Sequence, residues 1–281
     1  MSELLRALGA LAEAPGPEQA RIASAMGLPG QPATAEYAEL FLFQLYPYGS
    51  VYLGAGGMLG GDARDRVAGF WSAIGELPPE EPDHLTVLLA QLAAIAEREG
   101  FIEDAPGKRI LRHARHAFFW EHVGSWLFAY LGRAREIAAP FYRAWAETLT
   151  AALLDEAELL GPARELPLHF RDVPAMPAPS GADADRIADA LLAPVRSGII
   201  LTRTDLARIG ADMGVAARLG ERRQALARML ASSPGRAFGL LADEASRQAA
   251  LHRAGPSVLA RIADFWASRA EATAEALAAR V

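Results

Sequence analysis

Apolar side chains recur every three or four residues in almost every segment of this chain, and prolines and glycines separate one segment from the next. This spacing places the apolar residues on one face of an α-helix, which must then pack against other helices. The one β-like run, at residues 198–201, is too short to build a sheet. We therefore expect an all-α fold, a multi-helix bundle. One clear apolar stripe consists of Leu85, Leu88, Leu89, Leu92, Ile95 and Ala96.

Capping and turn residues predict where these helices begin and end. Pro140 suits the first turn of a long helix, because no amide proton is needed there. Asp83 is expected to be the N-cap of the helix that runs toward Glu99, since its carboxylate can accept orphan amide protons. Gly75 and Gly100 are expected to end helices. In the C-terminal part, helices are predicted at residues 183–192, 204–213, 220–231, 238–253 and 256–280.

A change of composition divides the chain. Five prolines fall between Gly161 and Gly181, a density typical of a linker or of an extended strap. We therefore expect a helical core over residues 1–161, a Pro-rich linker or strap over 162–182 and a helical C-terminal extension over 183–281. A strap of this kind would allow protomers to exchange elements, so a monomer and a homodimer both remain possible.

Composition excludes several classes of function. The chain has 281 residues, a net charge of −6 and no cysteine, which rules out disulfides, thiolate catalysis and cysteine-ligated metal sites. An acidic chain is not expected to bind a nucleic-acid backbone, whereas acidic clusters suit a basic peptide. The N-terminal residues lack the basic and apolar regions of a signal peptide, and no apolar run reaches the length of a membrane span. We expect a soluble, cytoplasmic protein that does not insert into a membrane.

The sequence shows no pattern typical of an enzyme. There is no Gly-x-Ser-x-Gly motif. Glu80, Glu81 and Asp83 could be proposed as an acid–base group, but a helix N-terminus favours the charged form of a carboxylate, which is unsuitable for a general acid. His113 and His116 share a helix face, yet a His-Glu-x-x-His motif is absent and neighbouring arginines would repel a cation. We predict no catalytic residue, no metal site and no cofactor.

Two alternative functions remain open. Residues 204–230 resemble a helix-turn-helix, with several arginines on the second predicted helix, although no asparagine is present to read bases. A helical transcriptional regulator is therefore one alternative. The Gly-rich loop at residues 54–61 suggests a nucleotide- or small-molecule-binding helical protein as another, although the loop lacks the lysine of a phosphate-binding loop and follows a helix rather than a strand.

The turn at residues 80–85 allows two interpretations. Three acidic groups, a proline and an imidazole come together where the apolar helix is expected to begin. One interpretation is a Pro-rich loop followed by a capped core helix. The other is a polar recognition patch that presents carboxylates to arginines, with aromatic residues nearby for an apolar segment.

The first 160 or so residues resemble the TorD/DmsD/NarJ family of redox-enzyme maturation chaperones. The resemblance begins with the aromatic-rich run Leu40-Phe41-Leu42-Phe43 and a loop that contains Ser50 and Tyr52. It continues with Pro82-Asp83-His84-Leu85 at the start of an apolar helix. It ends with His122 and Trp126 at a spacing of four, and with Pro140-Phe141-Tyr142 at the start of a long helix.

This resemblance implies a TorD-like helical bundle with an additional helical C-terminal region. It also implies a cytoplasmic chaperone that binds the signal peptide, of the twin-arginine type, or the apo form of a molybdenum-containing oxidoreductase, or both, while the cofactor is inserted. The client enzyme and its signal peptide are the expected partners. The expected peptide-binding residues are Tyr52, Trp71, Glu80, Glu81, Pro82, Asp83, His84, His122 and Trp126.

Overall fold

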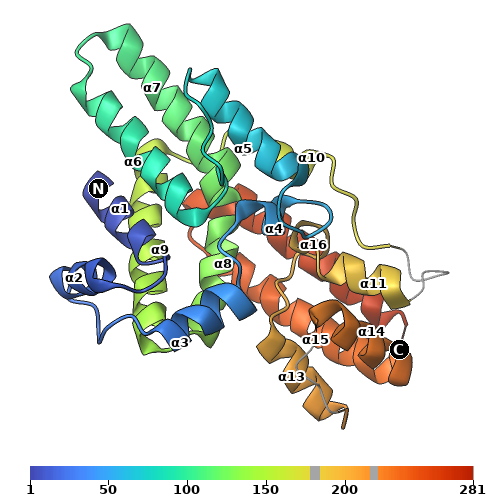
Figure 1. The fold of residues 1–281 in the computed structure, drawn as a ribbon. Helices are drawn as coiled ribbons and strands as arrows, with labels where there is room; N and C mark the ends of the chain where they lie inside the picture. Colours follow the sequence, from blue (N-terminus) through green and yellow to red (C-terminus); the bar gives the residue numbers. More distant parts are fainter. Residues whose placement is uncertain (178–183, 216–220, 281) are drawn as a thin grey trace. The chain divides into compact units, whose positions relative to one another are not determined.

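The computed structural model describes residues 1–177, 184–215 and 221–280, and it divides the chain into two compact units (Figure 1). Unit 1 comprises Met1–Ser50 and Gly60–Pro167, and unit 2 comprises Val51–Leu59 and Leu168–Val281. Within the described residues there is no strand, only an isolated antiparallel bridge between Tyr48 and His84. The prediction of an all-α fold is confirmed.

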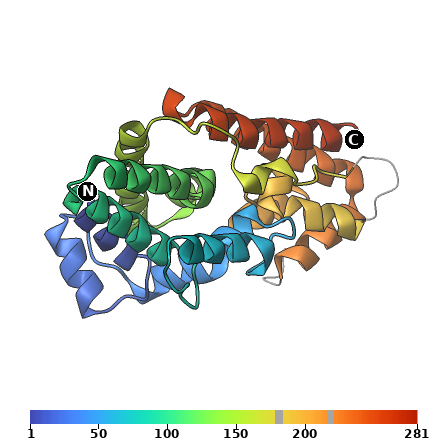
Figure 2. The same ribbon diagram turned by 90° about the horizontal axis from the view of Figure 1, so that it is seen from above.

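The helices of unit 1 pack in pairs. The first helix, α1, lies on α6; α6 and α7 form an antiparallel pair; and α8 lies on α9 (Figures 1 and 2). The predicted start of α9 at Pro140 is correct, and Gly75 follows the end of α5 with a φ of 80°, as expected for a glycine after a helix. The elements are α1 (Ser2–Ala10), α2 (Pro17–Ala25), α3 (Thr34–Tyr37), η1 (Ala38–Gln44), α4 (Gly49–Leu53), α5 (Gly61–Ala73), α6 (Leu85–Phe101), α7 (Ala105–Phe118), η2 (Phe119–Val123), α8 (Gly124–Ile137) and α9 (Pro140–Leu160).

Large aromatic side chains form the centre of unit 1. Phe41 of η1 meets Tyr142 and Trp145 of α9 edge-on, at ring-centroid distances of 5.3 and 5.4 Å. The indole N–H of Trp145 donates to the carbonyl oxygen of Leu8 in α1 at 2.8 Å, which satisfies the polar atom of a fully buried ring. Apolar burial and one buried hydrogen bond therefore join η1, α1 and α9.

A buried ion cluster connects α6, α7 and α9. The guanidinium of Arg115 donates to both carboxylate oxygens of Glu156, at 2.6 and 2.5 Å, and to Glu99 at 3.1 Å. All three residues are buried, and Glu156 is wholly inaccessible to solvent. The bidentate geometry and the multiple hydrogen bonds offset the cost of removing these charges from water.

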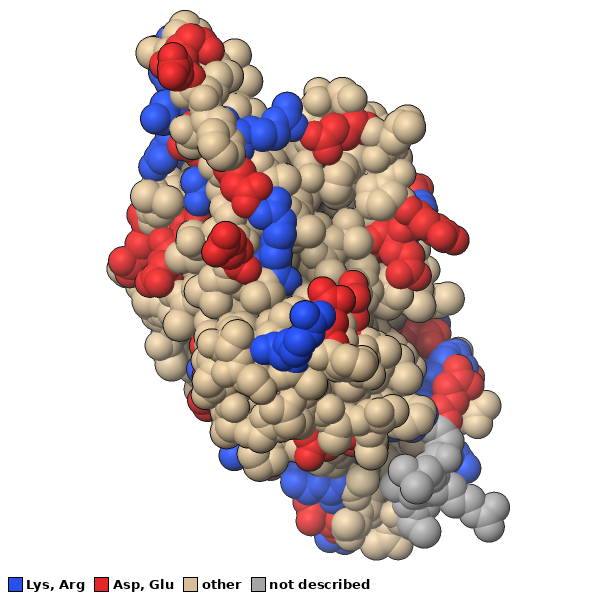
Figure 3. All heavy atoms as spheres, turned by 60° about the vertical axis from the view of Figure 1, so that its left-hand side comes forward, with Lys and Arg blue, Asp and Glu red and all other residues tan. Residues whose placement is uncertain are grey.

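Outside that cluster, charged side chains of both signs are mixed. Figure 3 shows one face of the described residues, where Lys and Arg groups alternate with Asp and Glu groups on a largely uncharged surface. That face therefore does not carry the continuous basic stripe that a nucleic-acid backbone would need. Among the described helices, none combines the length and hydropathy needed to cross a membrane.

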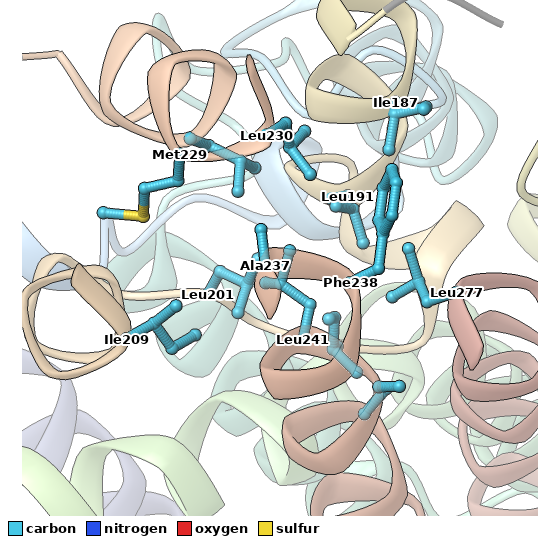
Figure 4. Packing of buried hydrophobic residues seen from close by; sticks show 14 of the residues in the cluster. Ile187, Leu191, Leu201, Ile209, Met229, Leu230, Ala237, Phe238, Leu241 and Leu277 are labelled. Atoms are coloured by element: carbon cyan, nitrogen blue, oxygen red, sulfur yellow. The ribbon is translucent and has the colours of Figure 1, made fainter. Parts of the chain in front are cut away.

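Unit 2 has its own hydrophobic core, to which most of its described helices contribute. Phe238 and Leu241 of α15 lie in this core with Leu191 of α11 and Leu277 of α16 (Figure 4). The longest pair is α15 with α16. The elements are α10 (Leu168–Arg171), α11 (Ala184–Leu191), α12 (Pro194–Ser197), α13 (Arg203–Asp212), α14 (Arg222–Ser232), α15 (Pro234–Arg253), η3 (Ser257–Leu259) and α16 (Ala260–Ala278).

The β-like run at residues 198–201 is buried and forms no strand, and the hydrogen-bond partner of its backbone is a side chain. The backbone N–H of Ile200 donates to the Gln248 amide oxygen at 2.9 Å, and the Gln248 amide nitrogen donates to the Ile200 carbonyl oxygen at 3.3 Å. The Gln248 amide thus replaces the neighbouring strand that a buried extended backbone normally needs. Gly198 begins the run with a φ of 74°, and a Cβ atom there would overlap the backbone of Ala270 in α16.

Several predicted boundaries differ from the structure. The helix expected to close at Gly100 continues to Phe101, because glycine tolerates a helix interior at modest cost. The predicted strap contains a short helix, α10. The expected helix starts at Asp183 and Gly220 lie outside the described residues, as does Arg218. The domain boundaries at 161 and 183 remain predictions.

The ion cluster generates the first testable prediction. Replacing Arg115 with alanine leaves the carboxylate of Glu156 buried without its main partner, so the free energy of unfolding of unit 1 should fall by about 3–5 kcal/mol. Urea unfolding followed by tryptophan fluorescence measures this change. Arg135, an exposed arginine of α8, provides the matched control, and Arg135→Ala should change the free energy by less than about 0.5 kcal/mol. Equal effects of the two substitutions would contradict a stabilising cluster.

Candidate functional site

Asp83 is the centre of the candidate site, but in a different role from the one predicted. Its carboxylate accepts the backbone N–H of Ser50 at 2.9 Å, and its carbonyl oxygen accepts the N–H of Gly49 at 2.9 Å. The prediction that Asp83 caps the following helix is wrong: α6 begins at Leu85, and its N-cap is His84. The Asp83 side chain, 2% exposed, instead holds the first turn of α4.

Two segments distant in sequence are joined at this point. Besides the two hydrogen bonds of Asp83, the N–H of Leu85 donates to the carbonyl oxygen of Pro47 at 2.8 Å. Tyr48 and His84 lie between these bonds as the two residues of the antiparallel bridge. We call residues 47–50 and 83–85 the clamp. Because the clamp fixes residue 85, it also fixes where α6 starts.

His84 serves the clamp in its neutral form. Its Nδ1 atom accepts the backbone N–H of Thr86 at 3.3 Å, so that nitrogen carries no proton. Burial lowers the pKa of His84 below its ordinary value, although the nearby carboxylates of Glu81 and Asp83 act in the opposite direction. The imidazole therefore stays neutral near pH 7 and can act as a hydrogen-bond acceptor at the helix N-terminus.

Tyr48 is a residue of the site that the sequence analysis did not identify. Its ring meets that of His84 edge-on, at a centroid distance of 4.8 Å, and its hydroxyl donates to a Glu81 carboxylate oxygen at 3.0 Å. Burial, together with the hydrogen bond to Glu81, raises the pKa of Tyr48 to about 12. Tyr48 thus remains protonated and orients one of the two acidic side chains. The only signal in the sequence was an aromatic residue two positions before Ser50. Tyr48 and its partner Glu81 are 33 residues apart, so no short-range sequence pattern predicts their contact.

The acidic residues of the turn are exposed. Glu80 and Glu81 both lie at the surface, and the carboxylate of Glu80 has no partner among the described residues. Arg64 of α5 donates to the Glu80 carbonyl oxygen at 2.9 Å, which fixes the backbone while leaving the carboxylate free. Leu77, in the preceding Pro-rich turn, is 93% exposed. We call residues 77–81 the acidic turn.

Trp71 lies at the end of α5, just before the acidic turn. The backbone N–H of Glu76 donates to the Trp71 carbonyl oxygen at 2.9 Å, so the helix end leads directly into the turn. The side chain is half-buried, and its indole N–H has no acceptor among the described residues. A buried indole N–H usually finds an acceptor, so this donor is notable beside an exposed turn.

The other predicted site residues are buried. Trp126 of α8 is fully buried; its indole N–H donates to the His122 carbonyl oxygen at 2.9 Å, and the ring lies under Gly49 of the clamp. His122 lies between the rings of Phe70 and Phe118. Pro82 is buried as well. These residues support the clamp, and their side chains do not line the exposed surface.

Tyr52 belongs to unit 2, whereas the other predicted site residues belong to unit 1. The chain leaves unit 1 after Ser50 and returns at Gly60, and the N–H of Gly60 donates to the Ser50 hydroxyl at 3.0 Å. Between these residues the loop is part of unit 2: a Cβ atom on Gly57, whose φ is 63°, would overlap the carbonyl oxygen of Leu192. This close packing explains why residue 57 is a glycine, so nucleotide binding is not needed to explain it.

The geometry gives no support to the helix-turn-helix alternative. Arg223 of α14 pairs with Asp189 of α11 at 2.5 Å, and Arg222 donates to the Leu201 carbonyl oxygen at 3.2 Å. Arg228 donates to the Gln224 carbonyl oxygen within its own helix. These arginines therefore contact their own chain.

Across the described part of the chain, no set of three His, Asp or Glu side chains lies close enough together to hold a metal ion.

Comparison with known proteins bears on residues 5–131, which match a model of the family described as nitrate reductase delta subunit. The match covers less than half of the chain and supports the assignment of this region to the TorD/DmsD/NarJ family. The resemblance inferred from the sequence motifs is thereby confirmed for this region, which contains the clamp, the acidic turn, Trp71 and Trp126. The family consists of redox-enzyme maturation chaperones, which bind oxidoreductase clients. Neither a curated protein nor a solved structure matches the chain.

The clamp generates a prediction about stability. Asp83→Ala removes the acceptor of the buried Ser50 N–H, so the free energy of unfolding of unit 1 should fall by about 1–3 kcal/mol. Asp83→Asn retains a side-chain oxygen and should cost less. Chemical denaturation of the two variants measures the difference. If alanine and asparagine were equally destabilising, the hydrogen bond to Ser50 would not be the contribution that matters.

His84 generates a prediction about pH. Its pKa is lowered in the folded state, so between the ordinary value near 6.5 and the lower folded value the unfolded chain binds more protons than the folded chain. The stabilising contribution is complete above pH 6.5 and is lost as the pH falls through the folded pKa. The loss amounts to about 1.4 kcal/mol for each unit by which the pKa is lowered.

Denaturation curves at pH 7.5 and pH 5 test this prediction with His84→Asn as the comparison. Asparagine is also a good N-cap but does not titrate in this range. The variant should therefore lose less stability on acidification than the wild type. An identical loss in both proteins would show that other groups cause the pH dependence.

Proposed function

We propose that this chaperone binds the signal peptide of a molybdenum-containing oxidoreductase, of the twin-arginine type, and holds the apo enzyme in the cytoplasm while its cofactor is inserted. The observation that carries the proposal is the match of residues 5–131 to a family of redox-enzyme maturation chaperones. The geometry of the acidic turn supplies a physical basis for recognition of such a peptide, as follows.

A twin-arginine signal peptide offers two guanidinium groups next to an apolar, helix-prone segment. The exposed carboxylates of Glu80 and Glu81 can each accept two parallel hydrogen bonds from one arginine. Glu81 is already oriented by Tyr48, which reduces the conformational entropy lost on binding. Two adjacent exposed carboxylates therefore complement two adjacent arginines.

The apolar part of the peptide would contact the surface beside the acidic turn. Leu77 is almost wholly exposed, and the half-buried Trp71 precedes it in the chain, near the end of α5. The Trp71 Nε1 atom is itself inaccessible to solvent, so the peptide would contact the accessible part of the ring rather than this donor. Leu77 and Trp71 thus extend the proposed contact surface.

The proposal divides the predicted site residues into two roles. Glu80 and Glu81 contact the peptide directly, together with Trp71 and Leu77. Asp83 and His84 position the acidic turn, because both belong to the clamp. The buried residues Pro82, His122 and Trp126 support the clamp from within unit 1. Tyr52, a residue of unit 2, is left out of the proposed contacts.

Peptide titration tests this proposal. In isothermal titration calorimetry with the full chain, a twin-arginine signal peptide should bind with an affinity that falls about tenfold or more in Glu80→Gln/Glu81→Gln, because each charge-assisted contact contributes about 1.5–3 kcal/mol. A peptide with two lysines in place of the arginines should also bind more weakly, since lysine cannot make the bidentate contact.

A double substitution of two other exposed carboxylates controls for net charge. Glu18 of α2 and Glu147 of α9 are both exposed, so Glu18→Gln/Glu147→Gln changes the net charge equally and should leave the affinity unchanged. An equal loss of affinity in both double variants would show that the peptide responds to the net charge of the protein and not to Glu80 and Glu81 in particular. The absence of binding by the wild type to any twin-arginine peptide would refute the proposed function.

A further inference from the structure

A second polar feature of unit 1, outside the clamp and the acidic turn, is a small hollow of about 90 Å³ between α7 and the C-terminal end of α9. Basic side chains dominate its lining, and no carboxylate contributes to it. Leu160 is the only apolar residue of the set. The hollow is lined by Arg109, Arg112, His113, His116, Leu160 and Arg164.

Two of the lining residues are explained by the fold. Arg112 donates to the Leu159 carbonyl oxygen at 2.6 Å and to Glu99 at 3.2 Å, so it caps the end of α9 and joins the buried ion cluster. His116 contacts the Pro162 carbonyl oxygen through Nε2 at 3.2 Å. The contacts of Arg112 and His116 therefore have a structural role at the C-terminal end of α9, where the helix dipole favours positive charge.

The remaining basic residues have no such explanation. Arg109, His113 and Arg164 make no hydrogen bond or ion pair with any of the described residues. Burial lowers the pKa of His116, the hydrogen bond to the Pro162 carbonyl oxygen raises it, and the nearby basic groups Arg164, His113 and Arg112 lower it. Crowding of unpaired like charges is unfavourable unless a counter-ion is bound.

We propose that this hollow binds a phosphate group, either free phosphate or the phosphomonoester of a small molecule. A hollow of about 90 Å³ has room for one tetrahedral oxyanion. Arginine forks match phosphate oxygens, and Arg109 offers such a fork; Arg112, three residues along the same helix face, adds positive charge while its own fork contacts Leu159 and Glu99. Arg164 approaches the anion from the segment after α9.

Binding of inorganic phosphate to the full chain tests the proposal. We expect saturable heat release in calorimetry that exceeds the response to chloride at matched ionic strength. Arg109→Gln and Arg164→Gln should each weaken binding roughly tenfold, because each removes one charge-assisted contact. Glycerol 3-phosphate is the second probe. Binding tighter than that of inorganic phosphate points to a phosphomonoester, and weaker binding points to the free ion.

Arg135→Gln is the matched control, since Arg135 is exposed on α8 and does not line the hollow. It should bind phosphate as the wild type does. Phosphate binding that is no stronger than chloride binding, or that falls equally in Arg135→Gln, overturns the proposal. Because Arg109 and Arg164 have no partner within the described chain, both variants should unfold at the wild-type urea concentration, and a weakened affinity then reports on the hollow itself.

Discussion

The hydrogen bond from the Ser50 N–H to the Asp83 carboxylate is the interaction on which the candidate site depends. It ties α4 to the residue just before the N-cap of α6, and the neighbouring bonds of Gly49 and Leu85 complete the clamp. The acidic turn leads directly into this clamp, so its two glutamates project from a backbone that is fixed on one side by Asp83 and on the other by Arg64. The buried Asp83 side chain thereby positions the exposed side chains of Glu80 and Glu81. The arrangement separates the residue that orders the site from the residues that are free to contact a partner.

The helical content of the chain was predictable because it depends on local periodicity. The stripe on α6, the start of α9 at Pro140 and the end of α5 before Gly75 all follow from residues within one or two turns of each other. The role of Asp83 was not predictable in this way. An aspartate before an apolar helix is a good N-cap, but the long-range bond to Ser50 engages its carboxylate, so His84 takes the capping position. Tyr48 was missed for the same reason, since its partner Glu81 is 33 residues away.

The two polar features of unit 1 have opposite charge and different physical origins. The acidic turn lies at the surface, and its carboxylates are exposed side chains on a backbone held by hydrogen bonds. The basic hollow lies at the end of α9, where one arginine is already required by the helix terminus and by Glu99. The buried pair of Arg115 and Glu156 stands close to that hollow in sequence, yet it is neutralised and shielded. Burial and pairing therefore distinguish structural charges from the ones available to a ligand.

The excursion of residues 51–59 into unit 2 has a consequence for how the protein is made. Val51, Tyr52 and Leu53 are buried, and Gly57 packs against the backbone at residue 192. The ribosome therefore releases this apolar segment more than a hundred residues before its partners in unit 2 exist. During that interval the apolar side chains of residues 51–53 lack their partners in unit 2 and are exposed on the nascent chain. A cut after Pro167 would remove the backbone at residues 192 and 193, against which Gly57 packs.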